Sequence, residues 1–148
     1  MRRTIAAVLC ALSLAAPAAA ETLLVGNKGE DTLSVIALTS GEELARLPTG
    51  KMPHEIAISP DGKLVATSNI ASGTISLFDA ETRAPLRTIR VSGEQAKGQV
   101  TLLFSADSKR LYAAETGHDK VAEIDVASGA VLRRIAAGKN GDGLAIAP

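Results

Sequence analysis

The sequence predicts an all-β fold, because it repeats with a period near 42 residues and each repeat alternates short apolar runs with turn residues. Residues 32–36 (TLSVI) recur as residues 74–78 (TISLF) and again as residues 120–124 (KVAEI). A second motif at residues 56–61 (IAISPD) returns at residues 102–107 (LLFSAD). Matching segments at a fixed distance along the chain indicate one supersecondary unit that is used several times.

Each repeat holds four predicted strands, which are runs of four to seven residues rich in Val, Ile, Leu and Thr. Residues 60–63 (PDGK) favour a hairpin, because Asp and Gly tolerate the dihedral angles of a tight reversal. Four strands per repeat are typical of β-propeller blades, small sheets that bury their faces against neighbours. The predicted strands are residues 22–26, 32–37, 43–48, 54–59, 63–68, 74–79, 86–91, 100–105, 109–115, 120–125, 131–136 and 143–147.

Helical and leucine-rich repeats are the competing architectures. No window of about 12 residues carries a sustained apolar stripe at the 3.6-residue spacing of a helix. Leucine-rich repeats are shorter and contain one strand each. Propeller blades, about three of them, are therefore the predicted fold.

Residues 1–20 have the pattern of a secretory signal peptide. Arg2 and Arg3 form a charged start, an apolar stretch follows, and residues 17–20 (PAAA) form a small-residue cleavage site. The apolar stretch is shorter than the roughly 20 residues that cross a bilayer as a helix. We expect residues 21–148 to form one repeat domain without a membrane span, in the periplasm or secreted.

Composition excludes several kinds of site. Cys10 lies inside the signal, so the mature chain has no thiol for a disulfide or a cysteine metal site. Removal of the signal leaves 14 basic and 16 acidic residues without a run of either sign, whereas nucleic acid needs a clustered basic face. Phe78, Phe104 and Tyr112 are the whole aromatic set, which is too few for base-stacking platforms. No nucleic-acid partner is expected.

The segment that begins at Pro53 resembles the YVTN-type β-propeller repeat of bacterial exported proteins. Its residues PHEIAISPDGKLVATSN and then GTISLFD carry the resemblance, which extends over residues 21–148. The four-residue signature itself falls on residues 24–27 (LVGN), 66–69 (ATSN) and 112–115 (YAAE). The repeat frame therefore matches better than the signature does.

The resemblance implies a ring of blades around a central channel, with any site at the channel or on the loops of one face. Closed propellers need at least four blades, and this chain has about three. Residues 22–48 supply three strands of one blade, and residues 143–147 supply only the first strand of another. We expect a partial propeller, a piece of a longer one, whose open blade edges favour self-association.

His54 and His118 are the candidate metal ligands, since they are the side chains that titrate nearest neutral pH. His54 opens a predicted strand, where a ligand would face the channel, and His118 lies in a turn. The two histidines lack ligand spacing, and zinc or copper sites need three or more converging ligands. The sequence therefore favours strand-edge and loop roles for both histidines, and no metal site.

No catalytic residue is predicted. Asp79 and Asp125 end equivalent strands, where a carboxylate is expected to accept backbone N–H bonds in the following turn. The other aspartates are scattered, and no loop gathers oxygen atoms at the spacing of a calcium site. Neither a Gly-x-Ser-x-Gly elbow nor a phosphate or dinucleotide loop occurs. The cofactor question stays open.

Two functions remain open at this point. The first is a non-catalytic binding or scaffold module for an unidentified protein or small molecule. The second is a piece of a propeller enzyme, or of a quinoprotein or metal-dependent periplasmic oxidation system. The resemblance allows both, because similar propellers include quinoprotein-associated proteins, lactone hydrolases and amine dehydrogenase heavy chains. The lack of a convergent reactive set in the sequence favours the first.

Signal processing provides a direct check of the compartment. Cleavage after the small residues Ala18 and Ala20 should leave Glu21 as the first residue of the exported chain. N-terminal mass analysis of material from the periplasmic fraction measures this. Intact Met1 in that fraction, or failure of the chain to leave the cytoplasm, would contradict the prediction.

Overall fold

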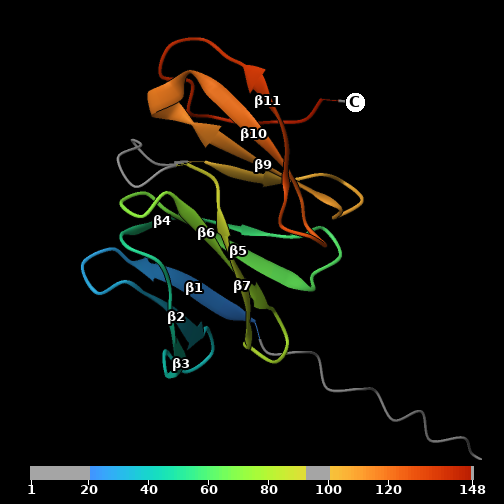
Figure 1. Ribbon diagram of the computed structural model, residues 1–148. Coiled ribbons are helices and arrows are strands. Elements are labelled where there is room, and N and C mark those ends of the chain that lie inside the picture. The colour runs from blue at the N-terminus through green and yellow to red at the C-terminus, as the bar shows by residue number, and fades with distance from the viewer. Residues whose placement is uncertain (1–20, 93–100, 148) are drawn as a thin grey trace, which may run out of the picture.

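Three antiparallel sheets make up the protein in a computed structural model that describes residues 21–92 and 101–147 (Figure 1). We call them blade 1 (order β1-β2-β3), blade 2 (β4-β5-β6-β7) and blade 3 (β8-β9-β10-β11). The strands are β1 (Thr22–Asn27), β2 (Thr32–Ala37), β3 (Glu43–Pro48), β4 (Pro53–Ile58), β5 (Leu64–Asn69), β6 (Thr74–Asp79), β7 (Pro85–Arg90), β8 (Leu102–Phe104), β9 (Arg110–Glu115), β10 (Lys120–Asp125) and β11 (Val131–Ala136).

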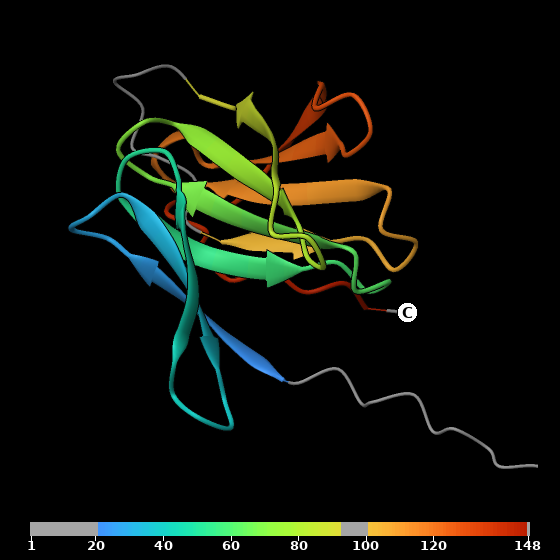
Figure 2. The same ribbon diagram turned by 90° about the horizontal axis from the view of Figure 1, so that it is seen from below.

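The blades lie face to face, and the chain passes from blade 1 through blade 2 to blade 3 (Figures 1 and 2). Blades 2 and 3 start at an inner strand, β4 or β8, and work outward by antiparallel hairpins. The strand β4 contacts both β1 and β8, so these strands form the inner side of the stack. Blade 1 begins at the equivalent of a second strand and has no inner strand among the described residues.

The predicted all-β blades are confirmed, and eleven of the twelve predicted strands occur within two residues of their expected bounds. The strand predicted at residues 143–147 is wrong, because these residues form no strand. The described residues offer no second strand of that next blade for them to pair with. Helix was expected only in the signal, but a short 3₁₀ turn, η1 (Thr116–His118), also occurs. Residues 1–20, including Cys10, and the insertion at residues 93–99 lie outside the described residues.

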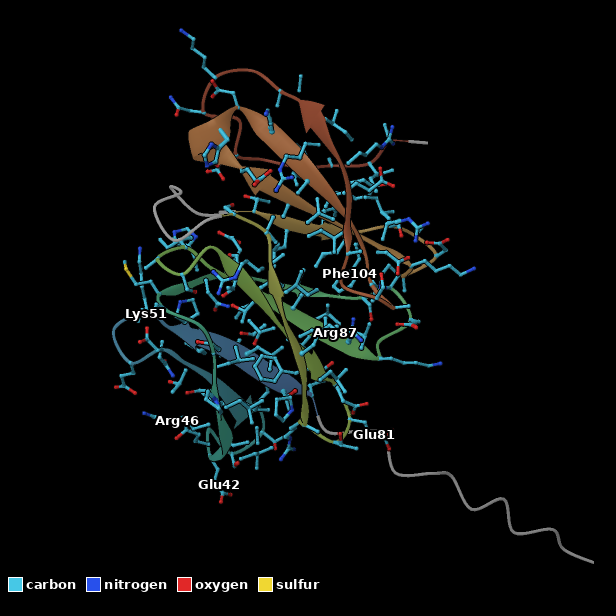
Figure 3. All side chains as sticks on the ribbon, in the orientation of Figure 1. Glu42, Arg46, Lys51, Glu81, Arg87 and Phe104 are labelled. Carbon is cyan, nitrogen blue, oxygen red and sulfur yellow. The ribbon has the colours of Figure 1, made fainter. Side chains whose placement is uncertain are left out.

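The main hydrophobic core lies between blades 2 and 3. Alternating residues of β5 and β6 point toward blade 3, because side chains of a strand alternate between its two faces. Phe104 of the inner strand β8 lies in this interface (Figure 3). Each fully buried apolar side chain contributes about 1.5–3 kcal/mol. The buried members are Ala66, Ile75, Leu77, Ile89, Val91, Leu102, Phe104, Leu111, Ala113, Ala122 and Ile124.

The interface between blades 1 and 2 is smaller. Its buried apolar residues are Leu33 of blade 1 with Val65 and Phe78 of blade 2. Half-buried side chains such as Leu24 and Ile56 pack around them. Blade 2 is therefore better covered on the side of blade 3 than on the side of blade 1.

No helix among the described residues is long and apolar enough to cross a membrane.

Gly50 lies where the chain crosses from blade 1 to blade 2, and its N–H donates to Ser76 Oγ at 3.2 Å. A Cβ at this position would stand 2.6 Å from Thr74 Oγ1 and 2.7 Å from Ser72 Oγ. Gly50→Ala should therefore lower the free energy of unfolding by about 1–3 kcal/mol, as overpacking does. Urea denaturation measures the change.

Gly29→Ala is the matched control, because a Cβ there would meet nothing within 4 Å. An equal loss of stability in both variants would contradict the account of Gly50.

Candidate functional site

One end of the blades carries the loops that could contact a ligand, and we call it the loop face. It consists of the turns between the second and third strands of each blade, at residues 28–31, 70–73 and 116–119. It also includes the connections that lead out of blade 1 and blade 3, at residues 49–52 and 137–142. Binding sites of propellers are built from such loops because the sheets beneath hold them in place.

The same pair of hydrogen bonds fixes the connections of blades 1 and 3 to the loop face. The N–H of Thr49 donates to Asp31 O at 2.9 Å, and that of Met52 donates to Asp31 Oδ1 at 2.8 Å. In blade 3 the donors are Ala137 and Asn140, and Asp119 accepts both bonds at 2.9 Å. Each aspartate thus fixes the start and the middle of its connection.

Blade 2 holds the same connection from the other side. The N–H of Lys51 donates to Ser72 Oγ at 3.1 Å, and Ile70 N–H donates to Met52 O at 3.1 Å. Residues 49–52 therefore lie between the turns of two blades and are bonded to both. The exposed side chains of Lys51 and Met52 project from a connection whose backbone is fixed.

Gly73 occupies the position of Asp31 and Asp119 in blade 2, and all three residues have a positive φ, between 53° and 64°. Its carbonyl accepts from Val91 N–H at 3.0 Å, like the first bond of the other blades. Glycine has no carboxylate for the second bond. The connection that follows Val91 is the one with the insertion in the sequence.

The structure places the two histidines on the loop face but not in one ligand set. His54 begins the inner strand β4, is exposed, and has its Nδ1 3.5 Å from Glu55 Oε1. His118 ends η1 and is also exposed. Within residues 21–92 and 101–147, no three His, Asp or Glu side chains converge so that they could hold a metal ion.

His118 lies at a hollow of about 190 Å³, which Val91, Ser92, Glu115, Lys120 and Arg134 also line. Glu115 is only 2% exposed, although it carries a charge. It accepts hydrogen bonds from Ser92 Oγ at 3.0 Å and from Arg134 Nε at 2.8 Å. Arg134 also donates to Val91 O at 2.7 Å.

Glu115 is a site residue that the sequence reasoning did not single out. Its equivalents in the other blades are Asn27 and Asn69, which donate to hydroxyls of the neighbouring strand. The visible signal was this change from amide to carboxylate at a repeated position. A buried carboxylate requires a partner, and Arg134 provides it. The pair ties β11 to the end of blade 2, so its geometry is that of a structural ion pair.

The opposite end of the blades uses its carboxylates to form turns. Asp79 accepts from the N–H of Thr82 at 2.7 Å, and Asp125 accepts from the N–H of Ser128 at 2.9 Å. These bonds lower the pKa of the Asp79 carboxyl, and the hydroxyl and N–H of Ser128 lower that of Asp125. The predicted turn-forming role of both aspartates is confirmed.

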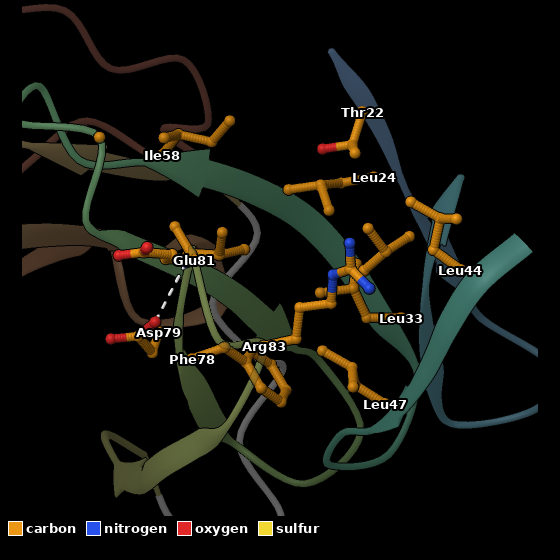
Figure 4. Close-up of a pocket in the computed structure, with 14 residues that line it drawn as sticks. Thr22, Leu24, Leu33, Leu44, Leu47, Ile58, Phe78, Asp79, Glu81 and Arg83 are labelled. Carbon is orange, nitrogen blue, oxygen red and sulfur yellow. Dashed lines mark hydrogen bonds between the residues drawn. The ribbon is translucent and has the colours of Figure 1, made fainter. Parts of the chain in front are cut away.

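A larger groove of about 600 Å³ separates part of blade 1 from blade 2 (Figure 4). Leu24, Leu33 and Leu47 line the side of blade 1, and Ile58 and Phe78 line the side of blade 2. The groove is apolar and offers shape more than chemistry.

These features define the class of the protein. Sheets that run from an inner to an outer strand, packed face to face and joined by hydrogen-bonded loops, are blades of a β-propeller. The chain belongs to the YNCE-like β-propeller family, whose model matches residues 3–146. The propeller resemblance of the sequence is thereby confirmed. No curated protein sequence is significantly similar to the chain.

Solved structures with the same fold have diverse names. Hydrazine synthase of Kuenenia stuttgartiensis is 22% identical with a TM-score of 0.70, over 81% of this chain and 34% of that one. The dihydro-heme d1 dehydrogenase NirN is 20% identical with a TM-score of 0.68, over 83% and 26%. The WD40 repeats of RRP9 are 19% identical with a TM-score of 0.69, over 80% and 36%. These likenesses show the fold, and the chain spans only about a third of these structures.

The histidines allow a test of metal binding at the loop face. Replacement of His54 by alanine should leave the metal content of the purified protein unchanged, because its described contact is with Glu55 alone and not with a ligand set. Elemental analysis by mass spectrometry measures the metal per chain. His118→Ala is the parallel variant. Stoichiometric metal in the wild type that either variant loses, with the fold intact by circular dichroism, would overturn this reading.

Proposed function

We propose that the chain is an exported, non-catalytic binding or scaffold module, located in the periplasm or secreted, that presents its loop face to a protein or small-molecule partner. The observation that carries this proposal is the double attachment of residues 49–52, which Asp31 and Ser72 hold from two blades. A surface that is fixed before binding loses little conformational entropy when a partner arrives.

The side chains of this surface support a contact role. Lys51, Met52 and His54 are exposed around the fixed connection, and they combine a charge, a flexible apolar chain and a ring with polar atoms. Their backbone, not their side chains, makes the hydrogen bonds that shape the loops. Substitution at these positions therefore changes the surface and leaves the scaffold in place.

The second candidate is a piece of a propeller enzyme or of a quinoprotein or metal-dependent oxidation system. Two similar structures favour it by name, since hydrazine synthase and the dihydro-heme d1 dehydrogenase are enzymes. Their identities of 22% and 20% support a shared fold only. A bound metal or redox cofactor in the purified chain would favour this candidate over the first.

Capture from periplasmic extract tests the binding module. The double variant Lys51→Ala, His54→Ala should lose most of the partner that the wild-type chain enriches, because both side chains project from the loop face. Lys63→Ala is the matched control, since Lys63 is exposed in the turn at the opposite end of blade 2. Quantitative mass spectrometry of the captured material is the measurement. Equal enrichment with all three baits, or loss with the control alone, would contradict the proposal.

A further inference from the structure

Blade 1 exposes the edge of a sheet at its inner side. Its strand order is β1-β2-β3, so β1 pairs with β2 on one side and with no described strand on the other. In blades 2 and 3 the equivalent strands β5 and β9 pair with the inner strands β4 and β8. An unpaired edge presents a row of N–H and C=O groups to any chain that can form a strand beside it.

The missing inner strand also leaves the next blade uncovered. Ile58 and Phe104 occupy the same position of the inner strands β4 and β8, but Ile58 is 58% exposed and Phe104 is 5% exposed. Phe104 packs against blade 2, which has an inner strand, whereas Ile58 faces blade 1, which has none. The groove of about 600 Å³ lies at this place, with Thr22 and Leu24 of β1 on its wall.

Residues 143–147 have the sequence of an inner strand. Leu144, Ala145 and Ile146 repeat the pattern of residues 56–58 and 102–104. They form no strand, and Ile146 is 55% exposed. The protein therefore contains a blade without an inner strand and an inner-strand sequence without a blade.

The start of this segment is fixed against blade 3. Thr116 Oγ1 donates to Gly141 O at 3.1 Å, and Thr101 Oγ1 donates to Asp142 Oδ1 at 2.9 Å. Residues 143–147 leave blade 3 from these contacts, while β1 lies at the other end of the stack (Figure 1). Because closed rings need at least four blades, three blades do not bring the two together within one chain.

We propose that residues 143–147 of one copy of this chain pair with β1 of a second copy as the inner strand of its blade 1. The register follows from the pairs of β4 with β5, which are Ile56 with Thr67, Ala57 with Ala66, and Ile58 with Val65. Translated by one repeat, Leu144 faces Val25, Ala145 faces Leu24, and Ile146 faces Leu23 of the other copy. If both copies exchange the segment, six blades form a ring, within the known range of four to eight.

The outer face of blade 1 agrees with a covering copy. Leu23 is 48% exposed, yet its equivalents in the other blades, Val65 and Leu111, are both buried by the preceding blade. On the opposite open face, Ile135 is 40% exposed and its equivalent Ile89 is buried. Both open faces thus carry apolar side chains at positions that are interior wherever a neighbouring blade is present.

Cysteine cross-linking tests the register. In blade 3, the bonds Ser105 N–H to Arg110 O and Ala114 N–H to Thr101 O bracket the pair of Leu102 with Ala113. That pair therefore lacks mutual backbone bonds and brings its Cβ atoms close, and Leu144 with Val25 is its equivalent.

In a Cys10→Ser background, a tagged Val25→Cys chain and an untagged Leu144→Cys chain should form a disulfide-linked heterodimer on mild oxidation. The matched control replaces Leu144→Cys by Ala145→Cys, whose side chain would point to the other face and should not cross-link. Light scattering after size exclusion should give twice the chain mass.

Three results would overturn the proposal: a monodisperse monomer, a disulfide that forms only within one chain when both cysteines are present, or aggregates in which both cysteine pairs react equally. Ala145→Pro gives a second readout, because Ala145 would donate to β1 and lies in no strand of the single chain. It should weaken the dimer about tenfold without changing the melting of the blades. The inference does not depend on the proposed function, and a failed partner capture leaves it intact.

Discussion

Burial of blade faces against neighbouring blades is the constraint on which the rest of this structure depends. A sheet of four strands has two faces and no interior, so Ile75 and Leu77 are buried only because blade 3 covers them. The inner strand decides how complete the cover is, as the contrast between the buried Phe104 and the exposed Ile58 shows. Loops and turns hold the blades at the spacing that this burial needs.

A polar ladder supports the loop-face end of each blade. Asn27 and Asn69, at the ends of second strands, donate to hydroxyl groups of the adjacent third strand. Glu115 takes this position in blade 3 and bonds to Ser92 and Arg134 instead. The exchange moves the contact from the same blade to the junction with blade 2, so one substitution converts an internal tie into a tie between blades.

The strands could be predicted from the sequence because a period of two residues and repeated turn residues are local properties. The unpaired state of residues 143–147 could not, since Leu144 and Ile146 have the right pattern and pairing also needs a partner strand. The histidines were correctly placed at a strand start and a turn. The hold of Asp31 on Met52, 21 residues away, depends on a backbone conformation that no pattern of residue types reveals.

The difference between Asp31 and Gly73 bears on how this repeat tolerates changes in loop length. A connection held by a carboxylate at its midpoint fits one length, because an extra residue would carry the bonded N–H away from the oxygen. The insertion at residues 93–99 falls in the repeat that has glycine at this position. Grafting of a foreign peptide should therefore be planned at that connection, whereas residues 50–52 are a poor site for it.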